Sequence, residues 1–218
     1  KVLICAAPLL PEGAKGAALA GVDTLPVLVP DDLVEQLPFP RLEDLAASAE
    51  PVATYVPRHP IDTATILYTS GTTGKPKGAE GCHFSLVEQV NVLLNGTLDL
   101  EPTDRILGCL PLFHTFGQTC VMNMGFRAGA AVVLVPKFDP ATALQLLNAH
   151  QCTVMTGVPT MYIALLEAAK TNPERPPLRY GMSGGAAIPV AVIERMKEVY
   201  GIDVHEGYGL TETSPVAS

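Results

Sequence analysis

The sequence predicts an α/β protein with a largely parallel β-sheet and helices on both faces of the sheet. Two observations support this fold class. From residue 60 onward, short apolar runs alternate with helical patterns. Several of the apolar runs are followed by loops rich in glycine and polar residues. A length of 218 residues suits one large domain or slightly more.

The elements follow in order along the chain. We expect strands at residues 2–6, 25–29, 61–69, 104–110, 131–135, 152–156, 179–183 and 203–206. We expect helices at residues 8–21, 31–37, 41–47, 85–94, 118–127, 140–150, 159–170 and 189–200. Three prolines between residues 50 and 60 mark an irregular connection. The expected organisation is therefore a flanking α/β segment at residues 1–59 and a core at residues 60–218.

Composition argues against several classes of function. A formal net charge of -8 disfavours a nucleic-acid partner, which would need a basic surface. No apolar run reaches the length of a membrane span, and no secretory signal precedes the first strand, so we expect a soluble, cytoplasmic protein. The five cysteines lack metal-ligand or disulfide spacing, and most should be buried thiols. The oligomeric state stays open, with a homo-oligomer among the alternatives.

The stretch Tyr68–Gly78 is unsuited to a hydrophobic core because its side chains are short, polar or cationic. Glycine lets backbone N–H groups turn toward one point, and hydroxyl groups add further donors. A strand pattern precedes the stretch and a helical pattern follows from His83, a setting in which phosphate binds at a helix N-terminus. The groups available to phosphate belong to Thr69, Ser70, Gly71, Thr72, Thr73, Gly74, Lys75 and Lys77. The alternative is a flexible surface loop.

Common nucleotide-binding motifs do not explain this stretch. Gly74-Lys75 is followed by Pro76 where a P-loop needs Ser or Thr, and the chain contains no complete GxGxxG. The stretch instead resembles the phosphate-binding motif of adenylate-forming enzymes, which include acyl-CoA synthetases, aryl-CoA ligases, luciferases and peptide-synthetase adenylation domains. The resemblance to this family covers residues 60–218 firmly and 1–59 loosely, and within the family the chain resembles a bacterial long- or medium-chain fatty-acid–CoA ligase.

A second motif, Gly207-Tyr-Gly-Leu-Thr-Glu-Thr-Ser-Pro215, is similar to another motif of the same family. The resemblance implies that Gly207, Tyr208 and Gly209 bind the nucleotide, with Tyr208 stacked on adenine. It also implies that Thr211 contacts the α-phosphate and that Glu212 holds Mg²⁺ together with Thr72. Read without the family, the stretch could be a turn with an incidental glutamate.

Two further segments resemble the family. Gly184, Gly185 and Ala186 follow a strand, and in the family such residues line the adenine and acyl pockets; the alternative is a plain tight turn. His114 matches a histidine that lies near the carboxylate being activated, although a lone histidine between aromatic residues is often a packed core residue. Amino-acid-activating relatives carry an aspartate pattern here instead, so His114 favours an acyl or aryl acid.

The resemblance implies a reaction in two steps. A carboxylate, in the main interpretation a fatty acid, attacks the α-phosphorus of ATP and releases pyrophosphate, and the acyl group then passes to coenzyme A as a thioester. Because both reactants of the first step are anions, the site must neutralise phosphate charge and hold the geometry. We expect His114, Lys75 and Glu212 to act in catalysis, with ATP, Mg²⁺ and coenzyme A as cofactor and co-substrates.

The loops at residues 69–78, 111–117, 183–187 and 206–214 should converge beyond the carboxyl ends of the strands, where open α/β sheets bind ligands. The chain also departs from the family. Gly81-Cys82 replaces Leu-Thr, so we expect a looser connection before His83.

The family's ribose-binding aspartate and its C-terminal lid domain have no counterpart in these residues. We therefore expect part of an N-terminal domain, inactive or nearly so alone. Aryl-CoA ligases or luciferase-like enzymes, and a truncated nucleotide-binding or interaction module without catalysis, remain alternatives. The acyl chain length stays open.

Overall fold

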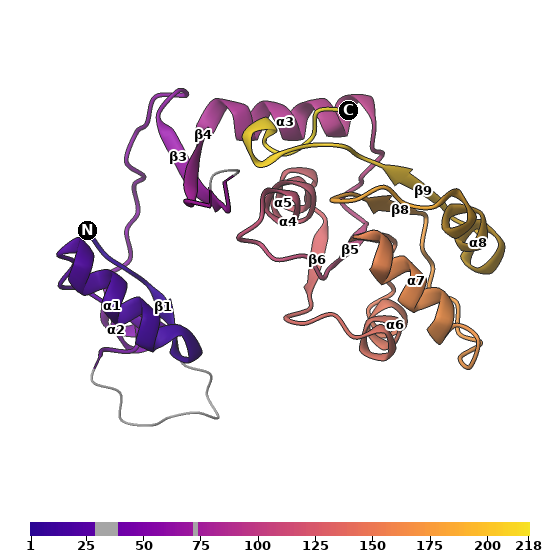
Figure 1. Ribbon diagram of the computed structural model, residues 1–218, viewed down its shortest axis with the longest axis horizontal. Helices are drawn as coiled ribbons and strands as arrows, with labels where there is room; N and C mark the ends of the chain where they lie inside the picture. Colours follow the sequence, from indigo (N-terminus) through magenta and orange to yellow (C-terminus); the bar gives the residue numbers. More distant parts are fainter. Residues whose placement is uncertain (29–38, 72–73) are drawn as a thin grey trace. The chain divides into compact units, whose positions relative to one another are not determined.

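A computed structural model describes residues 1–28, 39–71 and 74–218 and forms two compact units, residues 1–57 and 58–218 (Figure 1). The helix expected at residues 31–37 and the final residue of the strand expected at 25–29 lie outside the described residues. Thr72 and Thr73 also lie outside them. Among the described residues, no helix has both the length and the apolar character needed to cross a bilayer.

The smaller unit contains a short parallel strand pair and a few helices. Its elements are β1 (Cys5–Ala6), η1 (Ala7–Leu9), α1 (Leu10–Ala20), β2 (Val27–Leu28) and α2 (Leu42–Ser48). Gly21 ends α1 in the left-handed conformation, a common helix terminator. The core is small, with Cys5, Ala17 and Leu25 at its centre. Both strands are shorter than the sequence predicts, because only two residues of each pair with the other.

The larger unit is organised around a five-stranded sheet in which every strand is parallel to its neighbours, as predicted (Figure 1). The strands are β5 (Arg105–Gly108), β6 (Ala131–Leu134), β7 (Val154–Gly157), β8 (Tyr180–Ser183) and β9 (Asp203–Glu206). Their order across the sheet is β6-β5-β7-β8-β9. All the carboxyl ends therefore lie along one edge.

Helices cover both faces of this sheet, as predicted. They are α3 (His83–Gly96), α4 (Thr115–Gly117), the π-helical segment η2 (Gln118–Asn123), α5 (Met124–Ala128), α6 (Pro140–Ala149), α7 (Pro159–Ala168) and α8 (Val190–Tyr200). Successive strand residues point to opposite faces: Leu107 and Met155 pack with α6, α7 and α8, whereas Ile106 and Val154 pack with α3, η2 and α5. The two faces thus have separate apolar cores.

The predicted strand–loop–helix arrangement around Tyr68–Gly78 is wrong. β3 (Thr63–Thr69) and β4 (Lys77–Cys82) form an antiparallel pair, so a strand separates the loop from α3. The sequence pattern missed β4 because glycines interrupt it. Those glycines are needed, since a Cβ on Gly78 would lie 2.8 Å from the Ile66 side chain and one on Gly81 2.9 Å from Thr65 Oγ1.

The connection before α3 is also firmer than the sequence predicts. Cys82 pairs with Thr63 at the end of β4 and is at the same time the N-cap of α3. Its Sγ accepts a hydrogen bond from the Ser85 N–H at 3.4 Å. The helix therefore begins directly at the end of the strand, with no loose segment between them.

Candidate functional site

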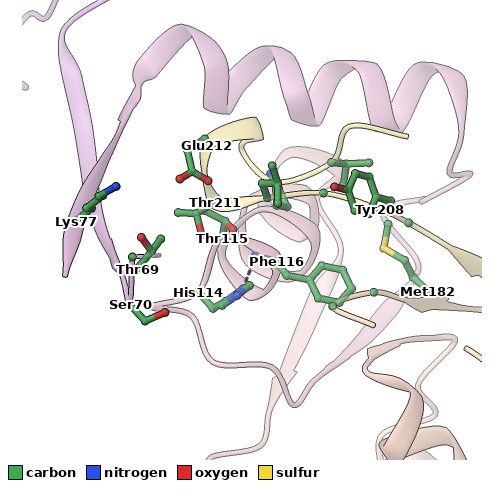
Figure 2. Close-up of a pocket in the computed structure, with 18 residues that line it drawn as sticks. Thr69, Ser70, Lys77, His114, Thr115, Phe116, Met182, Tyr208, Thr211 and Glu212 are labelled. Carbon is green, nitrogen blue, oxygen red and sulfur yellow. Dashed lines mark hydrogen bonds between the residues drawn. The ribbon is translucent and has the colours of Figure 1, made fainter. Parts of the chain in front are cut away.

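A cavity of about 490 Å³ opens at the carboxyl edge of the sheet, within the larger unit (Figure 2). Each of the four loops expected to converge contributes to its wall. The lining residues are Thr69, Ser70, Gly71, Lys77, His114, Thr115, Phe116, Met182, Gly184, Gly185, Gly207, Tyr208, Gly209, Leu210, Thr211, Glu212, Pro215 and Val216. This volume suits a small-molecule ligand.

Most of the residues predicted to bind nucleotide lie in this wall, and a few do not. Ala186 lines a neighbouring hollow of about 280 Å³, which it shares with Gly185, Gly207, Tyr208 and Gly209. Gly74 and Lys75 belong to the same turn as Ser70 and Gly71 but do not line the cavity. Thr72 and Thr73 lie outside the described residues, so their predicted contacts to phosphate and Mg²⁺ stay predictions.

The turn between β3 and β4 depends on glycine. Gly71 and Gly74 have φ of 65° and 78°, in the left-handed region that favours glycine. A Cβ on Gly71 would also collide with the carbonyl oxygen of Lys75. The turn brings Ser70 and Lys77 to the cavity from the hairpin, opposite Thr211 and Glu212 (Figure 2).

His114 is the N-cap of the helical segment after β5. Its Nδ1 accepts a hydrogen bond from the Phe116 N–H at 3.2 Å. A ring nitrogen that accepts carries no proton, so the neutral imidazole bears its proton on Nε2. The side chain is exposed and lines the cavity, which rules out the alternative of a packed core histidine. His114 can therefore donate from Nε2 to an anionic ligand.

The loop at residues 207–218, here called the Glu212 loop, closes on itself. The Tyr208 N–H donates to the Ser218 carbonyl at 2.7 Å, and the Leu210 N–H to the Pro215 carbonyl at 2.9 Å. Gly209 lies so close to the Pro215 carbonyl that a Cβ would collide with it. A short helical turn, η3 (Thr211–Thr213), then places Thr211 and Glu212 at the cavity.

Tyr208 presents an aromatic surface to the cavity. Its side chain is 63% exposed and lines both the main cavity and the neighbouring hollow. Aromatic rings bury their flat faces well against other flat ring systems. Tyr208 is thus placed to stack on a planar ring bound in this region (Figure 2).

The structure also reveals cavity residues that the sequence did not indicate. Thr115 lines the cavity, and its Oγ1 is buried without a hydrogen-bond partner among the described residues. Phe116 and Met182 supply apolar surface beside His114. Thr115 and Phe116 could have been predicted because they directly follow His114 in the chain. Met182 could not, because nothing in the local pattern distinguishes it from a core residue of a strand.

The donor set fits a magnesium ion that arrives with phosphates. Among the described residues no cluster of three metal-type side chains occurs, and Glu212 is the acidic residue that lines the cavity. Mg²⁺ usually keeps several waters and binds one or two carboxylates together with substrate phosphates. A lone Glu212 carboxylate across the cavity from the β3–β4 turn suits that mode of binding.

Comparison with known proteins gives concordant matches. The sequence matches the family described as AMP-binding enzyme over residues 1–218. A long-chain-fatty-acid–CoA ligase of Bacillus subtilis (strain 168) is 38% identical over 162 residues, which cover 73% of this chain and 29% of the ligase.

Solved structures of adenylate-forming enzymes share the fold. ATP-bound MatB from Rhodopseudomonas palustris has a TM-score of 0.82 and 32% identity, covering 99% of this chain and 41% of MatB. The anthranilate CoA ligase AuaEII in complex with anthranoyl-AMP has a TM-score of 0.86 and 25% identity, covering 99% of this chain and 42% of that protein. The chain therefore spans less than half the length of these relatives.

Proposed function

This chain belongs to the AMP-binding enzyme family, and we propose that it carries the nucleotide- and acid-binding site of a ligase that forms acyl-CoA through an acyl-adenylate. The observation that carries the proposal is one cavity shared by the β3–β4 turn, His114 and the Glu212 loop. The first element suits a polyphosphate, the second a carboxylate and the third a nucleotide. Adenylate formation requires the polyphosphate, the carboxylate and the nucleoside to lie side by side.

The first step joins two anions. A carboxylate oxygen attacks the α-phosphorus of ATP, the bond to the β-phosphate oxygen breaks, and pyrophosphate leaves with the electron pair. Lys77, the Ser70 hydroxyl and the amides of the turn would neutralise and hold the phosphates. His114 Nε2–H would donate to the carboxylate and orient it for in-line attack. Tyr208 would stack on adenine, and Thr211 would bind the α-phosphate.

Mg²⁺ would be held by Glu212 and supplies charge neutralisation of the phosphates when bound. The predicted partner of Glu212 in this role is Thr72. In the second step the thiol of coenzyme A attacks the acyl carbonyl carbon, and AMP leaves as an anion. The thiol proton is lost in this step.

The acid side of the cavity favours an apolar acid. Phe116, Met182 and Val216 add apolar surface to the cavity, and Glu212, the acidic residue of the described wall, is the proposed ligand of Mg²⁺ rather than of an ammonium group. We propose a fatty acid as the substrate, in keeping with the name of the Bacillus subtilis relative. The apolar wall would receive the alkyl chain.

One observation favours the alternative of a compact aryl acid. The space behind Met182, bordered by Cys120, Met124 and Tyr180, amounts to only about 10 Å³. Gly125 in α5 also packs closely, since a Cβ added there would lie 2.7 Å from the Val132 side chain. A long alkyl chain would have to displace flexible methionine side chains, whereas a planar acid fits the existing cavity.

Hydroxylamine trapping of the acyl-adenylate tests the proposal. The 218-residue chain and the longest product of its gene would be assayed with ATP, Mg²⁺ and a panel of alkyl and aryl acids. We expect hydroxamate from the longer product, and little or none from the 218-residue chain. Binding of ATP without hydroxamate from either would support a nucleotide-binding module and refute the ligase. A preference for benzoate-sized acids would favour the aryl alternative.

A further inference from the structure

Hydrogen bonds from three parts of the larger unit hold the Glu212 loop: the end of β8, the η2 segment and α3. At its base the Gly207 N–H donates to the Ser183 carbonyl at 2.9 Å. At its far end the carbonyl of Ser214 accepts a hydrogen bond from Thr119 Oγ1 at 3.0 Å. Both partners of this second bond are buried, with Thr119 at 0% and Ser214 at 8% exposure. On the side of α3, Ser214 Oγ donates to Ser85 Oγ at 3.4 Å, and the Gln89 side-chain amide donates to the carbonyls of Thr213 and Val216 at 2.9 and 3.0 Å. Thr119 is thus the anchor that the η2 segment provides.

The same helical segment carries both Thr119 and His114. α4, η2 and α5 follow one another without a break, and His114 caps the first of them. Thr119 lies in the π-helical part, a conformation often found at functional sites. Any shift of this segment therefore moves the acid-binding side chain and the anchor of the nucleotide loop together.

The hydrogen bond from Thr119 satisfies a Ser214 carbonyl that is buried and held in an unusual backbone conformation. Ser214 has φ of 68°, in the left-handed region that non-glycine residues rarely adopt, and its carbonyl is directed into the core. A buried carbonyl that loses its donor is destabilised relative to one that can turn to water. Removal of the Thr119 hydroxyl should therefore release the tip of the loop rather than leave it in place.

We propose that Thr119 is a positioning residue: its hydroxyl holds the Glu212 loop in register with the segment that carries His114. This proposal rests on the proposed function, because the register matters where a carboxylate and the α-phosphate must meet in line. Thr119 touches no ligand in this role. It acts through Ser214 on Thr211 and Glu212.

Three variants test it: Thr119→Val removes the hydroxyl at constant shape, Thr119→Ser keeps it, and Thr171→Val is a matched control. Thr171 also donates to a main-chain carbonyl, that of Ala168, but on the exposed surface after α7. With the variants made in the longest product of the gene, we expect Thr119→Val to lower kcat of adenylate formation on the order of tenfold. Thr119→Ser should stay within about threefold of the wild type, because its hydroxyl can still donate.

A role limited to stability would lower the melting temperature of Thr119→Val but leave kcat unchanged at temperatures where the variant is folded. That result would overturn the proposal. Equal loss in Thr119→Ser and Thr119→Val would also overturn it, since packing of the methyl group rather than the hydroxyl would then be responsible.

Hydrogen exchange gives a readout that needs no activity. In the unliganded protein, the amides of Tyr208, Leu210 and Ala217 are bonded within the loop. Their exchange should be faster in Thr119→Val than in Thr171→Val and the wild type. Unchanged exchange would refute the anchoring role. If the longest product of the gene forms no adenylate, the proposed function fails, while the exchange result still decides whether Thr119 anchors the loop.

Discussion

Asp104, at the amino edge of the five-stranded sheet, and Thr115 and Ser183, at its carboxyl edge, differ in how far their buried polar atoms are hydrogen-bonded. At the amino edge, Asp104 is 3% exposed and accepts from Thr153 Oγ1 at 2.6 Å, from the Glu101 N–H at 2.8 Å and from two nitrogens of Arg179 at 2.8 and 3.0 Å. At the carboxyl edge, Thr115 Oγ1 and Ser183 Oγ are buried without a hydrogen-bond partner in the described part of the chain.

This difference separates stability from ligand binding. A buried carboxylate lowers the stability of the fold unless its oxygens are satisfied, and Asp104 joins the starts of β5, β7 and β8 through fully used acceptors. Unpartnered buried groups are rare in folded proteins and call for an explanation such as a ligand or an ordered water. Thr115 has that explanation in the adjacent cavity. The hydrogen bonds of Asp104 join three strands at the amino edge, whereas the carboxyl edge leaves the Thr115 hydroxyl available to a ligand in the cavity.

The largest effect is expected from Glu212→Gln at the carboxyl edge. Loss of the carboxylate charge should lower Mg²⁺-dependent adenylate formation by about 100-fold or more, while the unfolding midpoint stays near the wild type. Hydroxamate assays at varied Mg²⁺ would measure this. Glu198→Gln, in an exposed pair with Arg195, is the matched control and should keep full activity. Wild-type activity in Glu212→Gln would remove Glu212 from the metal.

Asp104→Asn should break the amino edge. We expect a loss of about 2–4 kcal/mol in the free energy of unfolding at pH 7, because Arg179 would lose its charged partner. Partial exposure of Arg179 to water limits the loss. Asp203→Asn, in an exposed pair with Lys197, should cost at most about 1 kcal/mol. Urea unfolding measures both. Equal losses of stability in the two variants would mean that the burial of Asp104 adds nothing to the free energy of unfolding.

The same variant has a pH signature. Burial alone would raise the pKa of Asp104, but hydrogen bonds from Arg179, Thr153 and the Glu101 N–H outweigh it and lower the pKa below the ordinary value. The stability from Asp104 is therefore fully present above the unfolded pKa of about 4 and is lost as the pH falls through the lower folded value. The difference in the free energy of unfolding between wild type and Asp104→Asn should shrink below about pH 4. A difference that widened there would contradict a lowered pKa for Asp104.

Two Thr→Val variants, one at each edge of the sheet, remove the same chemical group and so compare the two edges directly. Thr153→Val removes a hydroxyl that donates to Asp104 and accepts from the Arg105 N–H at 3.0 Å, so we expect a loss of about 1–3 kcal/mol. Thr115→Val removes an unpartnered hydroxyl and should change stability by no more than about 0.5 kcal/mol. Its effect should appear in the KM for acid or ATP. Equal destabilisation by both variants would show that Thr115 has a structural partner.

The smallest effect concerns thiol reactivity. Hydrogen bonding to Ser85 lowers the pKa of Cys82, whereas burial raises the pKa of Cys109 to about 11 and that of Cys120 to about 12. All five cysteines are free, and Cys82 is the one that is not buried. Maleimide labelling of the native protein, followed by mass spectrometry, should show one fast site that Cys82→Ser abolishes. Fast labelling at several sites would mean that the cores open readily.

Local patterns in the sequence determined the parallel sheet, the helices on both faces and the loops that form the cavity. Alternation of apolar runs with helical periodicity identifies elements because each element buries its own apolar side. Glycine, hydroxyl and charged residues at the ends of strands predicted that Ser70, His114 and Glu212 lie close together, and all three line one cavity. For His114 and Glu212 the reason is that parallel strands end along one edge, whereas Ser70 comes from the antiparallel β3–β4 pair.

Only the tertiary structure decided the contacts between distant residues. β4 became a strand because β3 provides its hydrogen-bonding partner, in spite of Gly78 and Gly81. Asp104 and Arg179 are 75 residues apart, and Thr119 and Ser214 are 95 apart. No local periodicity encodes such pairs, because packing of the whole sheet brings them together. The cavity residues Ser70, His114 and Glu212 could be predicted from the chain, whereas these long-range pairs could not.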